Sequence, residues 1–249
     1  TDNSRKTVGS QFVWIPVGTV KLDEGEKTIK LSRYTFDSST GQILEQGDNV
    51  IDSYYQETGI SNDIEKFKKS VNENKGFYIG RYEARDESTE TERTEDSSTT
   101  NQLVCTENNY IYNWVNQQQA ETLSKNMYTN EKFYSNLINS YAWDTTIVFL
   151  QEFDDRENKI KPYSIQNSLN VGSIANQGTN KLNTKDVICN VYDMASNCTE
   201  RTTEASTSSR PCVGRGGSYN IESYYSSSRY GYYETSRYPD IGFRTILYF

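Results

Sequence analysis

The chain has 249 residues, a formal net charge of −8 and an aromatic content of 13%, including 20 Tyr. The aromatic content argues against global disorder, the acidic balance lacks the basic footprint of a nucleic-acid binder, and no apolar run reaches the ~18 residues of a membrane span. His is absent, which excludes Ser–His–Asp and Cys–His hydrolases and histidine-ligated metal sites within this chain.

The N-terminal third is predicted to be mainly strand. Residues 12–18, FVWIPVG, form a short apolar run closed by Pro and Gly, which predicts a buried strand. Hairpin-like pieces are expected around residues 27–31 and 33–36, and another strand is expected at residues 77–84.

Three helices are predicted from apolar residues that recur at helical spacing. The first follows Ser61, which we expect to cap it, and ends at Gly76. The three apolar stripes are Ile64, Phe67 and Val71; Ala120, Leu123 and Met127; and Trp143, Ile147 and Leu150.

Two stretches are predicted to be irregular. Residues 86–100 are acidic and rich in Ser and Thr, with no apolar residue, so we expect a mobile loop that contributes nothing to a core. Residues 151–186 are rich in Asn, Ser, Gly and Lys, which predicts mostly loop. No linker separates two cores, so residues 1–249 are predicted to form one domain.

The C-terminal third is predicted to contain strands at residues 187–192, 213–219 and 241–249, with a Ser/Thr-rich loop at 202–209. The last segment has the pattern of a strand with one buried side.

Three of these segments resemble landmarks of one known family. Residues 77–83, FYIGRYE, are similar to the F-x-I-x-x-Y-E strand of the formylglycine-generating-enzyme-like (sulfatase-modifying factor) domain. Residues 192–202, YDMASNCTERT, resemble its YDMAGNVWEWT segment, and RGGSY at 215–219 with IGFR at 241–244 resembles its ending. The landmarks occur in the family's order, and the resemblance spans about residues 12–249.

The resemblance implies an α+β fold of the C-type-lectin type in its elaborated form. Such a fold has a few helices, short twisted antiparallel sheets and much irregular loop. It also implies that the first and last strands pair with each other, which agrees with the apolar runs at both ends of this chain.

The chain departs from the family at the segment that helps to bind a calcium ion. The Gly and both Trp of that segment are replaced, whereas Asn197 and Glu200 remain. These two residues are therefore candidate calcium ligands, although a calcium ion needs several oxygen ligands and one motif does not supply them all. The other interpretation is a loop held by hydrogen bonds from Asn and Glu to the backbone.

The catalytic residues of the family are missing. Its oxidase members use two Cys, five positions apart, to bind copper, and the matching positions here are Ile221 and Ser226. The iron-dependent sulfoxide synthases of the family need a His cluster, and this chain has no His. We therefore expect no catalytic residues and no cofactor apart from the candidate calcium ion.

The four Cys contain no C-x-x-C pair, which disfavours a structural zinc site. Cys198 and Cys212 flank the loop at 202–209, so a disulfide between them is a candidate if the protein is exported. The alternative interpretation, which the sequence supports equally, is that both are buried free thiols. A reactive thiolate at either position, near Arg201, Arg210 or Arg215, would instead make the chain a divergent enzyme.

Residues 219–238 have the composition of a binding surface. Tyr alternates with Ser, Asn, Gly and Arg, as in antibody paratopes, and Arg229 and Arg237 are candidate anchors. The other interpretation is that Tyr occupies the half-buried face of irregular strands. The predicted ligand-binding residues are Tyr219, Asn220, Tyr224, Tyr225, Ser227, Arg229, Tyr230, Tyr232, Tyr233, Arg237 and Tyr238.

The same stretch resembles the hypervariable segment in the variable proteins of diversity-generating retroelements, which lies between RGGS and IGFR. Randomised adenines in AAC-type codons yield Tyr, Ser, Asn, Gly, Asp, Thr, Ile or Arg there, among others. Of the twenty residues from Tyr219 to Tyr238, only Glu222 and Glu234 fall outside that set.

The leading hypothesis is a non-enzymatic recognition protein of a bacterium or phage, with a protein or glycan ligand on another cell or surface. We expect it at the cell surface, outside the cell or on a phage particle. Membrane contact is expected only through an N-terminal anchor that has been removed, since the chain begins at Thr1 rather than Met. The alternatives are a divergent enzyme and a structural subunit of a surface appendage or phage tail.

Overall fold

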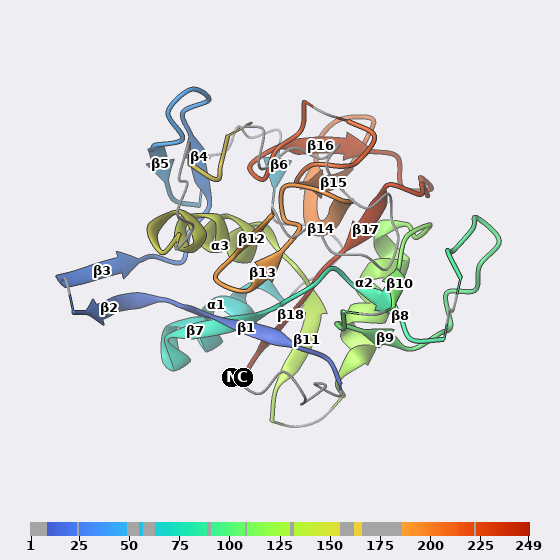
Figure 1. Cartoon of the computed structure of the whole chain (residues 1–249), viewed down its shortest axis with the longest axis horizontal. Coiled ribbons are helices and arrows are strands. Elements are labelled where there is room, and N and C mark those ends of the chain that lie inside the picture. The colour runs from blue at the N-terminus through green and yellow to red at the C-terminus, as the bar shows by residue number, and fades with distance from the viewer. Residues whose placement is uncertain are drawn as a thin grey trace.

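The computed structural model shows an α+β protein with short sheets that are mostly antiparallel (Figure 1). The residues that it describes are 9–23, 25–48, 55–56 (backbone only), 63–88, 91–107, 109–129, 132–154, 162–165, 186–221 and 223–249.

One sheet has four strands in the order β1-β7-β18-β11, with bounds Phe12–Pro16, Gly76–Gly80, Thr245–Tyr248 and Tyr134–Leu137. The expected pairing of the first and last strands is wrong, because β7 lies between β1 and β18 and pairs antiparallel with both. The position of β7 follows from its residues: Phe77 and Ile79 are fully buried, and Tyr78 on the other face is half-buried.

A second sheet carries the C-terminal landmarks. Its strands are in the order β16-β15-β14-β17, and β6 also pairs with β14; the bounds are Arg229–Tyr232, Cys212–Arg215, Thr199–Ser206, Ile241–Phe243 and Tyr55–Gln56. All pairs are antiparallel except β14 with β17. Residues 202–206, predicted as loop, therefore belong to β14: the pairing with β15 shifts register between Arg201 and Ala205, and Ala205 pairs with both β15 and β6.

The C-terminal segment 241–249 forms two strands, β17 and β18, that belong to different sheets. The break lies at Arg244, whose guanidinium is fully buried and paired with Glu200 on β14.

The three helices in the described part of the chain confirm the predicted stripes: α1 (Ile64–Asn74), α2 (Gln117–Met127) and α3 (Ser140–Glu152). Asp63 precedes α1, and the predicted cap Ser61 lies outside the described residues. Lys75 ends α1 in the left-handed conformation, with φ 63°. Gly76 is needed next, because a Cβ there would lie 2.2 Å from the Trp14 ring.

The main apolar core lies between the four-stranded sheet and the helices α1 and α3. Phe67 and Val71 of α1 and Ile147 of α3 are all fully or almost fully buried in it. A second cluster joins Ala120 of α2 to the region around Phe243. No helix in the described ranges is long and apolar enough to cross a membrane.

Smaller hairpins complete the described part of the fold. The β2–β3 hairpin projects at the left edge of Figure 1, and β12 and β13 are joined by Cys189 and Asn190, both with positive φ. The strands are β2 (Gly18–Leu22), β3 (Gly25–Ile29), β4 (Tyr34–Phe36), β5 (Ile43–Gln46), β8 (Arg85–Asp86), β9 (Leu103–Val104), β10 (Tyr110–Ile111), β12 (Val187–Ile188) and β13 (Val191–Tyr192). Most of the predicted loop at 151–186 lies outside the described residues.

The expectation that residues 86–100 contribute nothing to the interior is wrong. Arg93 is only 3% exposed and forms an ion pair with Asp86, which is fully buried. The Arg93 Nε also donates to the carbonyl oxygen of Asn113 at 3.2 Å, and its guanidinium lies over the Tyr112 ring. The composition of this stretch did not predict the contribution, because the side chain that is buried is a charged Arg93 paired with Asp86 and not an apolar residue.

Candidate functional site

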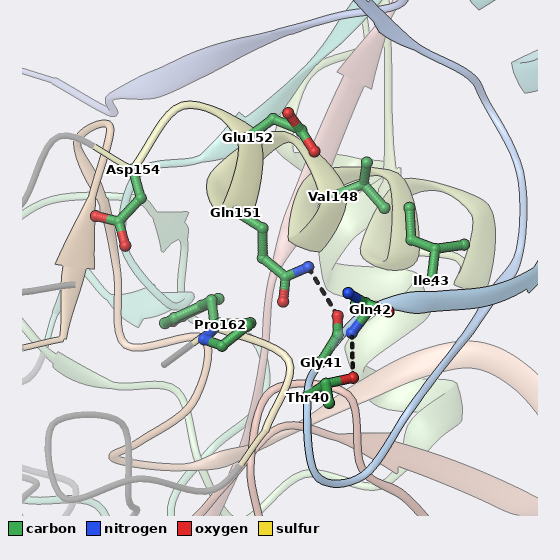
Figure 2. A pocket seen from close by; sticks show the side chains of 10 residues that line it. Thr40, Gly41, Gln42, Ile43, Val148, Gln151, Glu152, Asp154 and Pro162 are labelled. Atoms are coloured by element: carbon green, nitrogen blue, oxygen red, sulfur yellow. Dashed lines mark hydrogen bonds between the residues drawn. The ribbon is translucent and has the colours of Figure 1, made fainter. Parts of the chain in front are cut away.

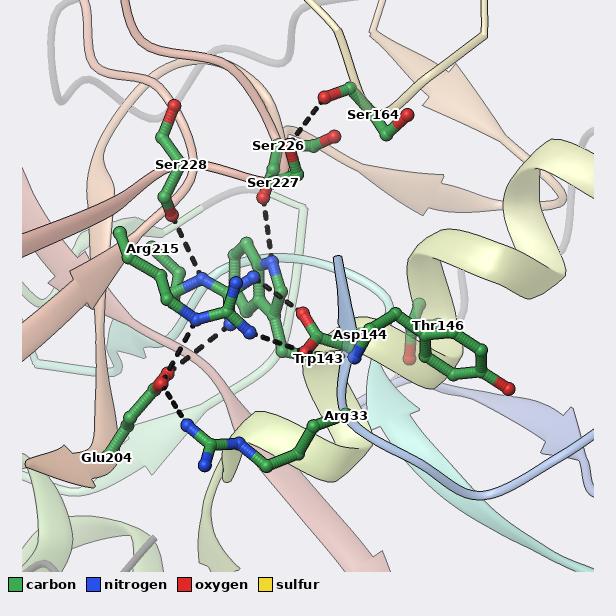
Figure 3. Close-up of polar contacts among 12 residues, drawn as sticks. Arg33, Trp143, Asp144, Thr146, Ser164, Glu204, Arg215, Ser226, Ser227 and Ser228 are labelled. Atoms are coloured by element: carbon green, nitrogen blue, oxygen red, sulfur yellow. Dashed lines mark hydrogen bonds and ion pairs between the residues drawn. The ribbon is translucent and has the colours of Figure 1, made fainter. Parts of the chain in front are cut away.

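Four buried charged residues form a cluster with one charged residue of the predicted binding segment (Figure 3). Its members come from the loop before β4 and from α3, β14, β15 and β16: Arg33, Asp144, Glu204, Arg215 and Arg229. Two carboxylates thus join three consecutive C-terminal strands to α3 and to the loop before β4.

Asp144 is the centre of this cluster. One carboxylate oxygen accepts from Arg215 Nη2 at 2.6 Å, and the other accepts from Arg229 Nη2 at 2.5 Å and from the Tyr34 backbone N–H at 3.0 Å. Burial acts to raise the pKa of Asp144, but the Arg215 and Arg229 charges outweigh it and hold the pKa below its ordinary value. Asp144 is therefore a carboxylate at neutral pH.

Glu204 completes the cluster from β14. Its Oε1 accepts from Arg33 Nη2 at 2.6 Å and from Arg229 Nε at 3.0 Å, and its Oε2 lies 3.4 Å from Arg215 Nη1. The expected surface role of Arg229 is consequently wrong: its guanidinium is held by two buried carboxylates, and the side chain is only 11% exposed. Arg229 attaches β16 to the interior of the protein.

The residues before Arg229 are also bonded to the scaffold. Ser226 Oγ donates to the carbonyl oxygen of Tyr163 at 2.6 Å, and Ser227 Oγ donates to that of Ser164 at 2.6 Å. Trp143 Nε1 donates to the Ser226 carbonyl oxygen at 2.8 Å (Figure 3). Ser226, which occupies one of the two positions that match the copper-binding Cys pair, is fully buried.

The tyrosines of the segment occupy the surface side of this anchored backbone. Tyr233 and Tyr238 are 51% and 45% exposed. The others are half-buried: Tyr219, Tyr224, Tyr225, Tyr230 and Tyr232. Tyr224 and Tyr230 stack on each other with ring planes 13° apart.

The remaining predicted ligand-binding residues are at the surface, but they differ in exposure and in the bonds that their side chains make. Asn220 is exposed. Arg237 is partly exposed, and its Nη2 lies 3.8 Å from Glu95 Oε1. Ser227 is partly exposed, although its hydroxyl is used by the bond to Ser164.

A pocket of about 270 Å³ opens among these tyrosines. Tyr232, Tyr233 and Tyr238 line it together with residues that the sequence did not suggest for ligand binding: Arg210, Ile221, Gly231, Ser236, Asp240 and Ile241. The Arg210 guanidinium lies 5.1 Å from the centre of the Tyr233 ring. The segment therefore forms a concave site with aromatic walls and a charge of each sign.

The candidate calcium ligands Asn197 and Glu200 are both fully buried and hydrogen-bonded to side chains. The Asn197 amide donates to Glu83, and Glu200 accepts from Arg244 Nη2 at 2.6 Å and from Arg244 Nε at 3.0 Å. Within the described ranges, no three Asp, Glu or Cys side chains are grouped as a metal site. The calcium ion stays a prediction, and the residues that would bind it are already engaged.

Four buried carboxyl groups, Glu83, Asp186, Asp193 and Glu200, interact in this region with one another and with Arg85 and Arg244. Burial raises the pKa of Asp193 to about 8, with a further contribution from the Asp186 charge. Burial also raises the pKa of Glu83 well above its ordinary value. Burial and the neighbouring carboxylate charges therefore favour the protonated forms of Asp193 and Glu83.

The candidate disulfide is not formed, since all four Cys are free thiols. Cys212 lies opposite Ala205 on β14, whereas Cys198 immediately precedes the start of that strand. Seven residues of extended chain span about 20 Å, far beyond the ~7 Å limit between bridged Cα atoms. Burial raises the pKa of both thiols, which disfavours the reactive thiolate that a divergent enzyme would need.

A second pocket, of about 440 Å³, lies between the turn before β5 and the end of α3 (Figure 2). The Gln151 side chain links two backbone groups there: its Nε2 donates to the Gly41 carbonyl oxygen at 3.3 Å, and its Oε1 accepts from the Ser164 N–H at 2.7 Å. Both polar atoms of the Gln151 amide are therefore used by hydrogen bonds that hold the fold together.

No protein-family model matches the chain, and no curated protein matches it. Among solved structures, the crystal structure of CarF is similar over 98% of this chain and 100% of its own, at 12% sequence identity and a TM-score of 0.47. At that score and identity the likeness assigns neither a fold family nor a function.

Proposed function

We propose that this protein is a non-enzymatic recognition protein that presents the tyrosines of residues 219–238 to a protein or glycan ligand. One observation carries the proposal. All seven tyrosines of the segment keep exposed surface. In contrast, the interior of the protein holds three other groups of the same segment, which are bonded to the scaffold: Ser226, Ser228 and the Arg229 guanidinium.

This arrangement suits binding because it limits the entropy lost when a ligand docks. Tyr offers a large amphipathic contact area with few rotatable bonds, and a backbone that is already ordered loses little freedom on association. Arg215 Nε donates to the Ser228 carbonyl oxygen at 2.9 Å, and Ser228 Oγ accepts from the Tyr225 N–H at 3.0 Å. These bonds order the segment in the absence of a ligand.

We also propose a C-type-lectin fold of the formylglycine-generating-enzyme type, in a protein exported to a cell surface or carried on a phage particle. Support comes from the two closing landmarks: RGGS begins at the last residue of β15 and IGFR begins β17, so the segment between them starts and ends in one sheet. The same sheet holds β14, which begins in the third landmark.

The link to diversity-generating retroelements is tested in the gene. We expect codons ending in T or C across residues 219–238, with a near-copy template and a reverse transcriptase gene nearby. Among copies of the segment, the exposed positions Tyr233 and Tyr238 should vary, and Arg229 should not, because its side chain neutralises buried carboxylates. A neighbourhood without template and transcriptase would exclude the link.

The recognition function is tested with the Tyr233→Ala/Tyr238→Ala double variant. Labelled protein is applied to arrays of glycans and of bacterial and host surface proteins, and the array ligand is then titrated. Binding should weaken at least about tenfold, since aromatic anchors carry most of the energy of an interface. The thermal midpoint should move by no more than about 3 °C, because both rings are exposed.

Tyr134→Ala is the matched control. Tyr134 is also exposed, at 38%, but lies on β11 outside the segment. It should leave ligand binding unchanged. Equal losses of binding in Tyr134→Ala and in the double variant would contradict the proposed surface, as would collapse of the fold in the double variant.

A further inference from the structure

The pocket of about 270 Å³ among the tyrosines is lined by three polar side chains that the described part of the fold leaves wholly or partly unused. Ser236 is only 8% exposed, yet its hydroxyl makes no hydrogen bond to a described residue. Asp240 Oδ2 accepts from Ser218 Oγ at 3.0 Å, and Oδ1 has no donor among the described residues. Arg210 is exposed, and its guanidinium contacts the Tyr233 ring. A ligand in the pocket can thus meet a hydroxyl, a carboxylate and a guanidinium.

The carboxylate disfavours a negative ligand in this pocket. Asp240 lines the pocket, and within the described ranges no cationic side chain pairs with it. Arg210 has the opposite charge, but its side chain is exposed, and an exposed cation attracts an anion only weakly through water and salt. A negative ligand would therefore gain little from Arg210 and would be repelled by Asp240.

The tyrosine rings disfavour a positive ligand, because guanidinium groups already contact two of them. The Arg210 guanidinium lies 5.1 Å from the centre of the Tyr233 ring. The buried Arg201 guanidinium lies 5.0 Å from the centre of the Tyr232 ring. A cation that approached these rings would be repelled by both charges. An uncharged ligand is therefore the best match to the pocket.

Such a ligand also has to satisfy the polar side chains. A hydroxyl group donates one hydrogen bond and accepts up to two, so one hydroxyl can donate to Asp240 while another accepts from Arg210. Hydrogen bonds to charged groups are stronger than those between neutral groups. The tyrosine rings, together with Ile221 and Ile241, offer apolar contact to the C–H groups of the same ligand. These requirements describe an uncharged ring that carries several hydroxyl groups.

We propose that the pocket binds one ring of a neutral sugar, with its hydroxyls at Asp240, Ser236 and Arg210 and its C–H groups against the tyrosines. The proposal rests on the recognition function and names its ligand class, a glycan with an uncharged ring. A volume of about 270 Å³ lies just below the roughly 300–1,000 Å³ of sites for drug-sized ligands, which suits one sugar ring.

The test compares sugars that share a ring and differ in charge. Methyl glucoside is titrated by calorimetry beside its acid, methyl glucuronide, and its amine, methyl glucosaminide, and the galactose and mannose series are titrated in the same way. In at least one series the neutral sugar should bind about tenfold or more tightly than both charged forms, because each charged form meets a like charge at the pocket. The proposal is wrong if no series shows this order or if no neutral sugar binds.

Two variants assign the preference to the charged side chains. Asp240→Asn should weaken binding of the neutral sugar by about tenfold, because a charge-assisted hydrogen bond is lost, and should narrow its advantage over the acid, because the repelling charge is gone. Arg210→Gln should narrow the advantage over the amine and keep the thermal midpoint, since the side chain is exposed. Unchanged preferences in both variants would contradict the site, whatever happens to the midpoint. Glu26→Gln, exposed on the β2–β3 hairpin, is the control that should change neither preference.

The outcomes separate this inference from the recognition function. If no neutral sugar binds but the array ligand still depends on Tyr233 and Tyr238, the sugar inference fails and the recognition function stands. If the arrays yield only protein ligands, and their binding falls in Asp240→Asn and Arg210→Gln, the pocket serves a protein and the sugar assignment is wrong. Sugar binding that is unchanged in the Tyr233→Ala/Tyr238→Ala variant would place the sugar outside the pocket and would also overturn the inference.

Discussion

Asp144→Ala is expected to lower the free energy of unfolding by about 3–5 kcal/mol, the usual range for removing one partner of a buried ion pair. The substitution would leave Arg215 Nη2, Arg229 Nη2 and the Tyr34 N–H without the acceptor they now share. Urea unfolding followed by tryptophan fluorescence measures the loss. Ligand binding should fall as well, because Arg229 would no longer be held against α3.

Glu152→Ala is the matched control on the same helix. Glu152 is half exposed and lies 3.4 Å from Lys27 Nζ, so its removal should change the free energy of unfolding by no more than about 1 kcal/mol. If Asp144→Ala were as mild as Glu152→Ala, the buried cluster would not be what attaches the binding segment to the protein.

Asp193→Asn is expected to make the protein more stable at pH 8 than the natural chain. Burial first, and the Asp186 charge second, raise the pKa of Asp193 to about 8, while the Arg85 and Arg244 charges oppose this without reversing it. Between the unfolded pKa of 3.8 and the folded pKa of about 8, the folded state holds a proton that the unfolded chain has released. The free energy of unfolding therefore falls as pH rises through this window and levels off above it.

The variant cannot ionise at this position, so its advantage should be small near pH 4 and grow toward pH 8, by up to about 1.4 kcal/mol per pH unit. Asn also tolerates the left-handed backbone at this position, where φ is 62°. Urea unfolding at several pH values measures the slope. Parallel stability curves for the two proteins would show that Asp193 does not hold this proton.

Asp186→Asn is the control for a general effect of removing acid from the cluster. Asp186 accepts from the Tyr163 hydroxyl at 2.7 Å, from the Ala195 N–H at 3.0 Å and from Ser196 Oγ at 2.7 Å. An amide would turn an NH₂ group toward donors, so this variant should be less stable at every pH tested.

Local pattern was sufficient for the helices and for most strands. The spacing of Phe67 and Val71 and of Trp143 and Ile147 predicted faces that are buried in the structure, because one helix face meets the core at each turn. The composition of residues 219–238 likewise predicted a tyrosine surface, and those tyrosines are half-buried or exposed. Whether the surface binds a ligand stays a prediction.

The local sequence pattern did not predict which strands pair with each other. The run 241–249 reads as one strand, and the first and last strands were expected to pair. In the structure the run divides at Arg244 and β7 separates the two end strands. Apolar alternation records which side of a strand is buried, but the choice of partner depends on contacts with distant segments.

Residue types and their spacing along the chain were enough to indicate an aromatic, Ser-rich surface on an α+β protein. The placement of charge was decided by the tertiary structure: it put Arg229 inside, brought Arg93 into the interior, kept Cys198 far from Cys212 and left Arg201 without a carboxylate among the described residues. The physical reason is that burying a charge is costly unless a partner comes within a few ångströms, and partners such as Arg33 and Glu204 lie 171 residues apart in the chain.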